Sequence, residues 1–243
     1  MKKHLLRVLF LGACLCAALA APAAPASADP RFTVVKIDLR TERLELFLRD
    51  DAGEPFKRFD RLDAWLKERH RQLSFAVNAG MYHEDFSPVG LLVREGREEA
   101  PLNLADGAGN FFLKPNGVFL VSDAGARVVE SSEYPALAAG VRLATQSGPL
   151  LLRHGVVHPA FIPHSASRKI RNGVCVGVEG HTAVFVLSET PVNFHEFALY
   201  FRDVLHCRDA LYLDGTVSAL HSTALGRSDF VRELGPMLGV APP

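Results

Sequence analysis

An aspartate followed by a glycine closes a short apolar run in Leu211-Tyr212-Leu213-Asp214-Gly215-Thr216-Val217-Ser218. The run reads as a buried strand, and a carboxylate beside it costs roughly several kcal/mol unless it is paired, hydrogen-bonded or used in chemistry. Gly215 lets the backbone turn sharply or lets a ligand approach closely. The pattern therefore indicates either an acid/base group at Asp214 or a plain cap of the next turn, because Asp-Gly is also a common turn sequence.

Other apolar runs also end beside polar side chains and a glycine. Asn78 follows one run, Gln146 and Ser147 follow a second, and Asn172 stands before a third. An amide offers two donors and an acceptor, which suits sugar hydroxyls and phosphate oxygens. For Asn78 an Asx-turn is the alternative interpretation.

Basic side chains stand beside these polar tips. Lys114 adjoins the predicted turn Pro115-Asn116-Gly117 and is either a turn cation or a group that faces an anion. The segment Arg168-Lys169-Ile170-Arg171 holds three cations in four positions, and arginine can grip a phosphate with two parallel hydrogen bonds. In an extended chain Arg168 and Arg171 face opposite sides, so we expect one to face a ligand and the other to brace a carboxylate. Converging tips of this kind predict a cleft for a sugar joined to an anion.

The N-terminus has the composition of a secretory signal peptide. A basic start is followed by an apolar stretch and by Ala26-Ser27-Ala28, a small-residue cleavage site. The apolar part is too short for a stable membrane span. We therefore predict a signal peptide over residues 1–28, one domain over residues 29–243, and a periplasmic or secreted location. Lipidation at Cys14 is an alternative that would leave a very short signal.

Charge and cysteine content limit the function classes. The whole chain has 27 basic and 27 acidic side chains, and residues 1–28 hold three basic residues and no acidic one. The mature chain thus lacks the basic excess of a nucleic-acid-binding protein, and we expect no such partner. Cys175 and Cys207 remain after cleavage and could pair. No pattern typical of metal ligands is present, so we predict no metal and no cofactor.

Alternating apolar positions predict mainly strands. Residues 32–39 and 43–48 are expected to be strands with a short turn between them, and residues 111–113 and 118–121 are expected to form a hairpin. Asp60 is the expected cap of one helix, and Asn193 with Glu196 forms the capping box of another. Strands dominate without regular alternation with helices, which predicts an α+β fold: a single domain with a mixed or antiparallel sheet, hairpins and a few packed helices.

Five motifs in this order resemble the phosphodiester glycosidase family, in a bacterial exported branch. The resemblance covers about residues 32–221, nearly the whole mature chain. The motifs are Asn78-Ala79-Gly80-Met81-Tyr82, Asn110-Phe111-Phe112 with Lys114-Pro115-Asn116-Gly117, Gln146-Ser147-Gly148-Pro149, Ser167-Arg168-Lys169-Ile170-Arg171-Asn172-Gly173 and Leu213-Asp214-Gly215.

The resemblance implies hydrolysis at a sugar anomeric carbon that carries a phosphodiester. It implies that Asp214 is the acid/base group or nucleophile and that Arg168 stabilises the phosphate. Many members have a second glycine where this chain has Thr216. The expected substrate contacts are Asn78, Lys114, Gln146, Ser147, Arg171, Asn172, Gly215 and Ser218.

Two other functions stay open at this point. Glycosidases usually use two carboxylates, and only Glu84 and Asp85 are candidates for the second. With Thr216, this favours the alternative of a non-catalytic protein that binds an envelope polysaccharide on the same scaffold. A cell-wall glycan hydrolase without a phosphate in its substrate is a third interpretation, and the basic segment at residues 168–171 argues against it.

Overall fold

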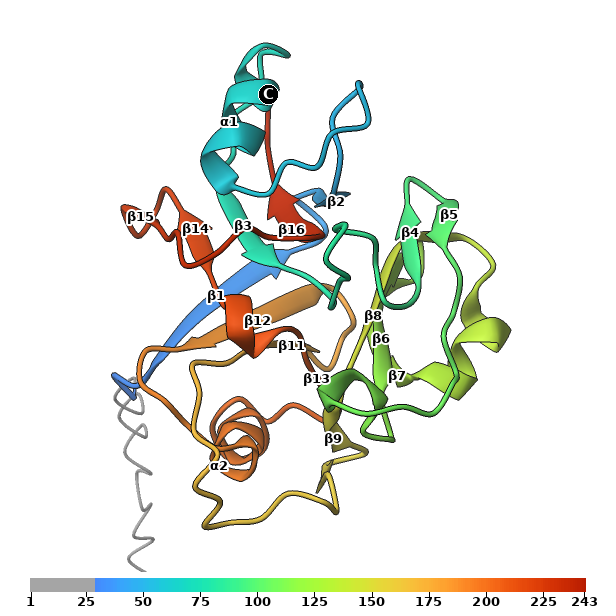
Figure 1. Ribbon diagram of the computed structural model, residues 1–243, viewed down its shortest axis with the longest axis vertical. Helices are drawn as coiled ribbons and strands as arrows, with labels where there is room; N and C mark the ends of the chain where they lie inside the picture. Colours follow the sequence, from blue (N-terminus) through green and yellow to red (C-terminus); the bar gives the residue numbers. More distant parts are fainter. Residues whose placement is uncertain (1–28) are drawn as a thin grey trace, which may run out of the picture.

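The regular secondary structure is mostly antiparallel sheet, with few helices. The computed structural model describes residues 29–243, so the predicted signal peptide and Cys14 lie outside the described residues. Three sheets are present in this part of the chain (Figure 1). The secondary structure thus agrees with the coarse prediction of strands with a few helices, and it contains more strand than an α+β fold commonly does.

The first sheet carries the central aspartate at the end of one of its middle strands. Its six strands lie in the order β1-β12-β11-β13-β9-β10, and every pairing is antiparallel. Strands β11 and β12 form a hairpin that turns through Glu179-Gly180. The strands are β1 (Phe32–Asp38), β9 (Leu150–Arg153), β10 (Val156–Val157), β11 (Asn172–Val176), β12 (Thr182–Ser188) and β13 (Ala210–Tyr212).

The second and third sheets have five strands each, in the orders β15-β14-β3-β16-β2 and β5-β4-β8-β6-β7. The strands of the second are β2 (Leu44–Phe47), β3 (Phe75–Asn78), β14 (Leu220–Ser222), β15 (Arg227–Ser228) and β16 (Met237–Val240). Those of the third are β4 (Leu92–Arg94), β5 (Arg97–Ala100), β6 (Gly117–Ser122), β7 (Gly125–Glu130) and β8 (Val141–Ser147).

One apolar core joins the three sheets. Phe185 of β12 lies between Phe75 of β3 and Phe119 of β6, with ring centroids 5.1 and 6.0 Å away. All three side chains are almost completely buried. Because each ring comes from a different sheet, burial of this cluster fixes the sheets against one another and brings together the strand ends that carry the polar motifs.

Helices cover the outer faces of two sheets. Helix α1 (Phe59–Lys67) buries Leu62 and Leu66 in a cluster with Met237 of the second sheet. Helix α2 (Phe194–Leu199) continues as a π-helical turn, η3 (Tyr200–Val204), and packs Phe197 against the first sheet. Cys175 and Cys207 form a disulfide in the same cluster. Short 3-10 turns complete the list: η1 (Asn110–Phe112), η2 (Ser131–Leu137) and η4 (Gly215–Val217).

Helix starts are partly as predicted. The capping box of α2 is confirmed, because the Asn193 side chain accepts from Glu196 N at 2.9 Å and Asn193 N donates to Glu196 Oε2 at 3.1 Å. Asp60 is not the cap of α1. The cap position is Arg58, and the Asp60 carboxylate instead accepts bonds from its guanidinium.

The two strands predicted over residues 32–39 and 43–48 are present as β1 and β2. They lie in different sheets, because the Asp38 carbonyl accepts from Thr41 N and Glu42 N and turns the chain towards another sheet. The predicted hairpin of residues 111–113 with 118–121 is wrong. Residues 111–113 are not a strand, because Asn116 Nδ2 donates to Phe111 O at 2.8 Å and curls the segment into a 3-10 turn. Strand β6 pairs with β7 and β8 instead.

Candidate active site

Two buried asparagines join the first and second sheets. Asn78 ends β3 and Asn172 begins β11, and both are at most 2% exposed. Asn172 Nδ2 donates to Asn78 Oδ1 at 2.9 Å, and Asn78 Nδ2 approaches Asn172 Oδ1 at 3.4 Å. Buried amides need such partners, because an unpaired one costs about 1–3 kcal/mol.

The amide pair holds the backbone of Asp214. Asn78 Nδ2 donates to the Asp214 carbonyl at 3.0 Å, and Ser218 Oγ donates to the same oxygen at 3.2 Å. Ala219 N donates to Asn78 Oδ1 at 3.1 Å. With these contacts every donor and acceptor group of the two amides is engaged. The predicted substrate-binding residues Asn78, Asn172 and Ser218 are thus brought together, and their polar atoms face one another and the turn.

The third sheet contributes Ser147 at the end of β8. Its hydroxyl donates to the Leu213 carbonyl at 2.9 Å, and Leu213 N donates to Asn172 O at 3.1 Å. The residue before Asp214 is therefore held from two sheets. Strand ends from all three sheets meet at this turn, as the convergence of polar tips predicted.

The hydrogen bonds of Asn78, Asn172, Ser147 and Ser218 form a frame that holds the backbone around residue 214. The Asp214 carboxyl is the polar group that this frame leaves available. Its Oδ1 accepts from Thr216 N at 3.0 Å, while Oδ2 has no hydrogen bond to any residue in the range 29–243. Partial burial raises the pKa of Asp214 above its ordinary value of 3.8, against the opposing effect of the Thr216 N–H. A carboxyl that holds its proton more tightly and has a free oxygen is suited to acid/base chemistry.

Gly215 is required by its neighbour Tyr212. The Tyr212 hydroxyl accepts from Gly215 N at 2.6 Å, and a Cβ at position 215 would collide with this hydroxyl. Burial, and to a smaller extent the charge of Asp214, raise the pKa of Tyr212 to about 12 against the opposing effect of Arg171. The glycine predicted as a substrate contact therefore allows the tyrosine to pin the turn that presents Asp214.

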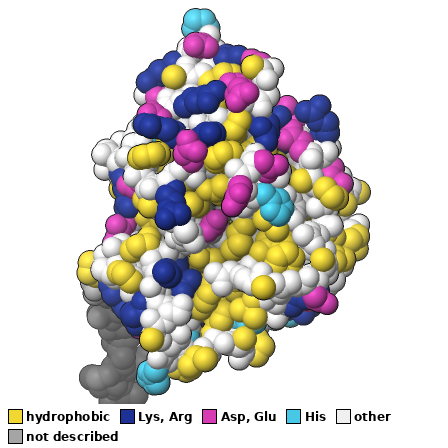
Figure 2. All heavy atoms as spheres, in the orientation of Figure 1, with side chains coloured by type: hydrophobic (Ala, Val, Ile, Leu, Met, Phe, Trp, Pro, Cys, Tyr) yellow, Lys and Arg dark blue, Asp and Glu magenta, His cyan; other side chains and the backbone are white. Residues whose placement is uncertain are grey.

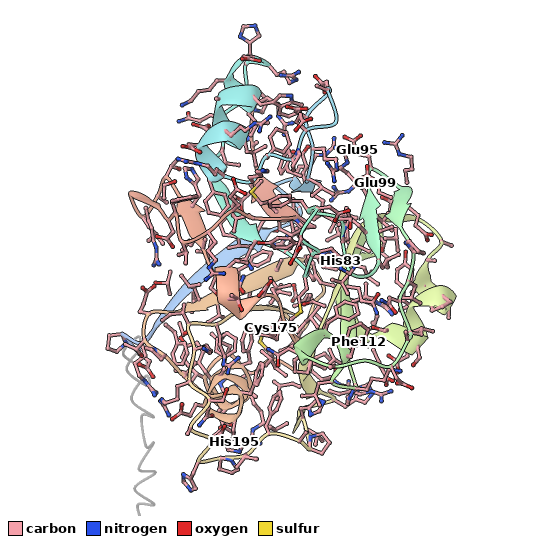
Figure 3. The ribbon with its side chains drawn as sticks, in the orientation of Figure 1. His83, Glu95, Glu99, Phe112, Cys175 and His195 are labelled. Atoms are coloured by element: carbon pink, nitrogen blue, oxygen red, sulfur yellow. A yellow bond between two sulfur atoms is a disulfide. The ribbon has the colours of Figure 1, made fainter. Side chains whose placement is uncertain are left out.

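A second tyrosine, Tyr82, packs against the apolar cluster that contains Val217 of the turn. Burial and the charge of Asp214 raise the pKa of Tyr82 to about 12, and its hydroxyl donates to the Glu233 carbonyl at 2.5 Å. Its ring stacks on Phe86 with centroids 5.7 Å apart. The same loop carries His83 to the middle of the face drawn in Figure 3. Figure 2 shows acidic side chains and a histidine at the middle of this face, beside a broad hydrophobic area.

Gln146 ties together the loops around the site. Its Oε1 accepts from Leu91 N at 3.0 Å and Asn103 N at 2.9 Å, and its Nε2 donates to Asn103 O at 2.7 Å and Ser131 Oγ at 3.0 Å. A Cβ at Gly90 would collide with this amide. Gln146 was predicted to bind substrate, but the structure gives its amide four partners within the chain.

Two of the predicted anion-binding cations, Arg168 and Lys114, are exposed, and each has a carboxylate partner. Arg168 Nη2 lies 2.8 Å from Glu196 Oε2, and Lys114 Nζ lies 2.7 Å from Asp106 Oδ1. The side chains of Arg168 and Lys114 are 45% and 43% exposed. Either cation can take up a ligand anion only by exchanging its partner for that anion, at the expense of a solvent-screened ion pair.

Arg171 is only 1% exposed and lies beneath the site. Its Nε donates to Val192 O at 2.9 Å and its Nη2 to Ser167 O at 3.1 Å. Its guanidinium stacks on the Phe194 ring at 3.6 Å from the centroid. Burial lowers the pKa of Arg171, which the nearby Tyr212 partly offsets. The expected opposite orientation of Arg168 and Arg171 is present, with one exposed and one buried, and the buried one braces carbonyls rather than a carboxylate.

The candidates for a second carboxylate form no hydrogen bond with Asp214. Both Glu84 and Asp85 are exposed. Asp85 Oδ1 accepts from Ser87 N at 2.9 Å and Ser87 Oγ at 2.6 Å, and these bonds lower the pKa of Asp85. The Asp85 carboxylate therefore accepts the hydrogen bonds that close its own turn. Among residues 29–243 no carboxylate shares a hydrogen bond with Asp214.

The comparisons with known proteins decide the family. A family model described as phosphodiester glycosidase matches residues 71–239, more than half of the chain. The chain belongs to the phosphodiester glycosidase family. The resemblance predicted from the five motifs is thereby confirmed.

The chain is also similar to the uncharacterized protein YigE of Escherichia coli K12. It is 37% identical over 198 residues, which cover 81% of this chain and 77% of that protein.

Two solved structures share the fold. The catalytic domain of zebrafish N-acetylglucosamine-1-phosphodiester alpha-N-acetylglucosaminidase, auto-inhibited by its pro-peptide, superposes with a TM-score of 0.59 and 13% identity, covering 90% of this chain and 86% of that one. A protein of Burkholderia pseudomallei K96243 described as exported superposes with a TM-score of 0.55 and 15% identity, covering 87% and 74%. At these identities the likeness shows the fold alone.

Sequence reasoning missed the two tyrosines of the site. Tyr82 and Tyr212 both stand inside family motifs, next to residues that were singled out, and their place within two to four residues of Asn78 or Asp214 was the available signal. For metals, no group of three His, Cys, Asp or Glu side chains gathers anywhere in the part of the chain that the structure describes. No described helix is long and apolar enough to cross a membrane.

Proposed function

We propose that this member of the phosphodiester glycosidase family is an exported hydrolase that cleaves sugar-1-phosphodiesters of an envelope or extracellular glycan. The observation that carries the proposal is the single available carboxyl of Asp214, held in a frame whose other motif side chains are saturated. A frame of this rigidity presents a catalytic group at a fixed place, which is what proximity and orientation require.

In the proposed reaction Asp214 is the general acid. Its proton passes to the phosphate oxygen of the glycosidic bond as the bond from the anomeric carbon to that oxygen breaks. Water adds to the anomeric carbon and returns a proton to the carboxylate, so the products are the free sugar and a phosphomonoester. A phosphate leaving group needs less protonation than an alcohol, which is consistent with one carboxyl serving where most glycosidases use two.

Export is part of the proposal. The N-terminal pattern of a signal peptide and the Cys175–Cys207 disulfide support it together, because disulfides persist mainly in oxidising compartments such as the periplasm. Fractionation of cells that express the full-length chain, followed by mass determination of the mature N-terminus, tests this part. We expect cleavage after Ala28 and recovery outside the cytoplasm.

The second candidate is a non-catalytic protein that binds an envelope polysaccharide. The engagement of Asp85 with Ser87 of its own turn favours it, because glycosidases usually use a second carboxylate. This candidate predicts glycan binding without product release, and binding that survives the Asp214→Asn substitution.

One screen separates the two candidates. The purified mature protein is incubated with sugar-1-phosphodiesters, starting with the methyl phosphodiester of N-acetylglucosamine 1-phosphate, and free sugar is measured with and without chelator. Release that Asp214→Asn abolishes supports the hydrolase. Binding of the phosphodiester with no release by the wild-type protein supports the binding protein instead.

A further inference from the structure

Two arginines without an ion pair lie where the second and third sheets adjoin. Arg142 belongs to β8, and its Nη1 donates to the Leu44 carbonyl of β2 at 2.8 Å. Arg43 immediately precedes Leu44 and is exposed. Neither arginine forms a salt bridge with another residue in the range 29–243, whereas Arg71 beside them is paired with Glu45. The contact between the sheets thus brings two unpaired guanidinium groups to one place.

Both arginines line the same surface hollow, which has a volume of about 340 Å³. Its other lining residues are 39–42. A second, smaller hollow is also lined by Arg43 and Arg142. The bond to the Leu44 carbonyl holds the Arg142 side chain in position, and its Nε and Nη2 have no partner among residues 29–243. Arg142 is therefore a positioned cation with free donors, and Arg43 is a second cation at the same hollow.

Positive charge exceeds negative charge in this hollow. Besides Arg43 and Arg142 it contains Arg40 and Glu42. Arg40 Nη2 lies 2.7 Å from Asp38 Oδ2, and Glu42 Oε2 accepts from Asp38 N at 3.1 Å. Burial and the charge of Arg43 lower the pKa of Arg142, against the opposing effect of two carboxylates. An anion held between Arg43 and Arg142 offsets both the burial of one charge and the repulsion between the two.

Two guanidinium groups suit a phosphate better than a carboxylate. One arginine fork satisfies the two oxygens of a carboxylate, whereas a phosphate has further oxygens for a second fork. There is also room for an organic group that carries the phosphate. A cavity of about 630 Å³ adjoins the hollow at residues 41–43 and extends to Ser74 and to Glu95, which Figure 3 labels on the turn between β4 and β5. Hydroxyl and carboxylate side chains in this cavity can accept hydrogen bonds from sugar hydroxyls.

We propose that Arg43 and Arg142 form a phosphate-binding site separate from Asp214. Arg142 stands five residues before Ser147 on β8, and Ser147 contacts the turn at Asp214, so about 16 Å of strand separates the two sites. The site goes beyond the proposed hydrolysis and does not depend on it. A glycan with several phosphodiesters along its chain can occupy both sites at once, and the second contact then raises its affinity through effective concentration.

Titration of inorganic phosphate into the Asp214→Asn protein tests the site in the absence of turnover. We expect binding that Arg43→Ala weakens roughly tenfold, the usual effect of losing a hydrogen bond to a charged group. The Arg43 side chain makes no hydrogen bond within residues 29–243, so its loss should leave the unfolding free energy unchanged. Arg142→Lys keeps the charge but loses the fork and should also weaken binding. Arg208, an exposed arginine before β13 without an ion pair in the described chain, gives the matched control Arg208→Ala, which should bind normally.

A polymer of N-acetylglucosamine 1-phosphate, titrated into the same proteins, separates two sources of the phosphate. If it binds more tightly than inorganic phosphate and Arg43→Ala removes the difference, the ligand is a glycan. If Arg43→Ala weakens only the binding of inorganic phosphate, the ligand is free phosphate. Binding of both probes that Arg43→Ala leaves unchanged overturns the site, even where the wild-type protein releases sugar from the polymer. Weakened binding by Arg43→Ala without any release of sugar by the wild-type protein upholds the site and overturns the hydrolase proposal.

Discussion

Replacement of Asp214 by asparagine separates the acid function of the side chain from its structural contact. Asparagine keeps an Oδ1 that accepts the Thr216 N–H now bonded at 3.0 Å, and it is as good a cap of a helical turn as aspartate. The Asn78 contact is to the backbone carbonyl of residue 214 and is unaffected. The frame should therefore stay intact while the proton donor is lost. Because a general acid contributes about 10²- to 10⁴-fold, we expect kcat to fall by that factor.

The same substitution has a predictable effect on stability. The folded-state pKa of Asp214 is raised by burial above its ordinary 3.8, so the folded protein binds the proton more tightly than the unfolded chain. As pH rises from below 3.8 through the folded pKa, the carboxylate forms at a cost to the folded state, and that cost persists at neutral pH. Asp214→Asn should thus be more stable than wild type at pH 7, by about 1.4 kcal/mol for each unit of the pKa shift.

Two measurements check this reasoning on the same samples. Chemical denaturation at a series of pH values gives the difference in unfolding free energy, which should vanish at acid pH and reach its plateau above the folded pKa. Initial rates of sugar release over the same pH range should decline as pH rises through that pKa. A variant that is less stable than wild type at pH 7, or one that retains the wild-type rate, would refute the assignment of Asp214 as a buried general acid.

Other substitutions test the frame and the cations. Asn172→Ala leaves polar groups of Asn78 unpaired in the core, so denaturation should show a loss of roughly 1–3 kcal/mol. Tyr212→Phe removes the acceptor of Gly215 N, and we expect a lower kcat with a smaller effect on KM in steady-state assays. Glu196→Gln keeps the acceptor of the α2 capping box but frees Arg168, and an unchanged KM is expected if Arg168 is not the phosphate ligand. Replacing both cysteines of the disulfide by serine should cost about 2–4 kcal/mol in the same denaturation assay.

The sequence predicted that the polar motif residues would lie close together, because each of them stands at the end or the beginning of a core strand. Apolar strands must bury their faces together, so the ends of β3, β11 and β13 are carried into one region by the core around Phe185. Periodicity located these strands to within a few residues. It did not show that β3 belongs to a different sheet from β11 and β13, since the sheet to which a strand belongs depends on turn contacts such as those at the Asp38 carbonyl.

The partners of the motif side chains could not be predicted from the sequence. Asn78 and Asn172 are 94 residues apart, and nothing in either segment indicates that one amide satisfies the other. Glu196 lies 28 residues after Arg168 on a helix whose capping box was recognised, yet its second contact with the arginine depends on how the helix packs. Residue type alone shows that a polar group needs a partner, and only the fold shows whether that partner is the chain or a ligand.

Thr216 illustrates how a departure from a family pattern can leave the frame intact. It stands where many family members have glycine, but its φ is not positive and its side chain is exposed, so the backbone here does not need the freedom of glycine. Gly215, by contrast, cannot be replaced without displacing the Tyr212 hydroxyl. The threonine thus changes the surface that a substrate meets next to the carboxyl, whereas the hydrogen bond from Thr216 N to Asp214 uses the backbone and needs no particular side chain. The position of this departure therefore bears on which substrate the proposed site accepts, and the geometry of the turn follows from Tyr212, Asn78 and Ser218.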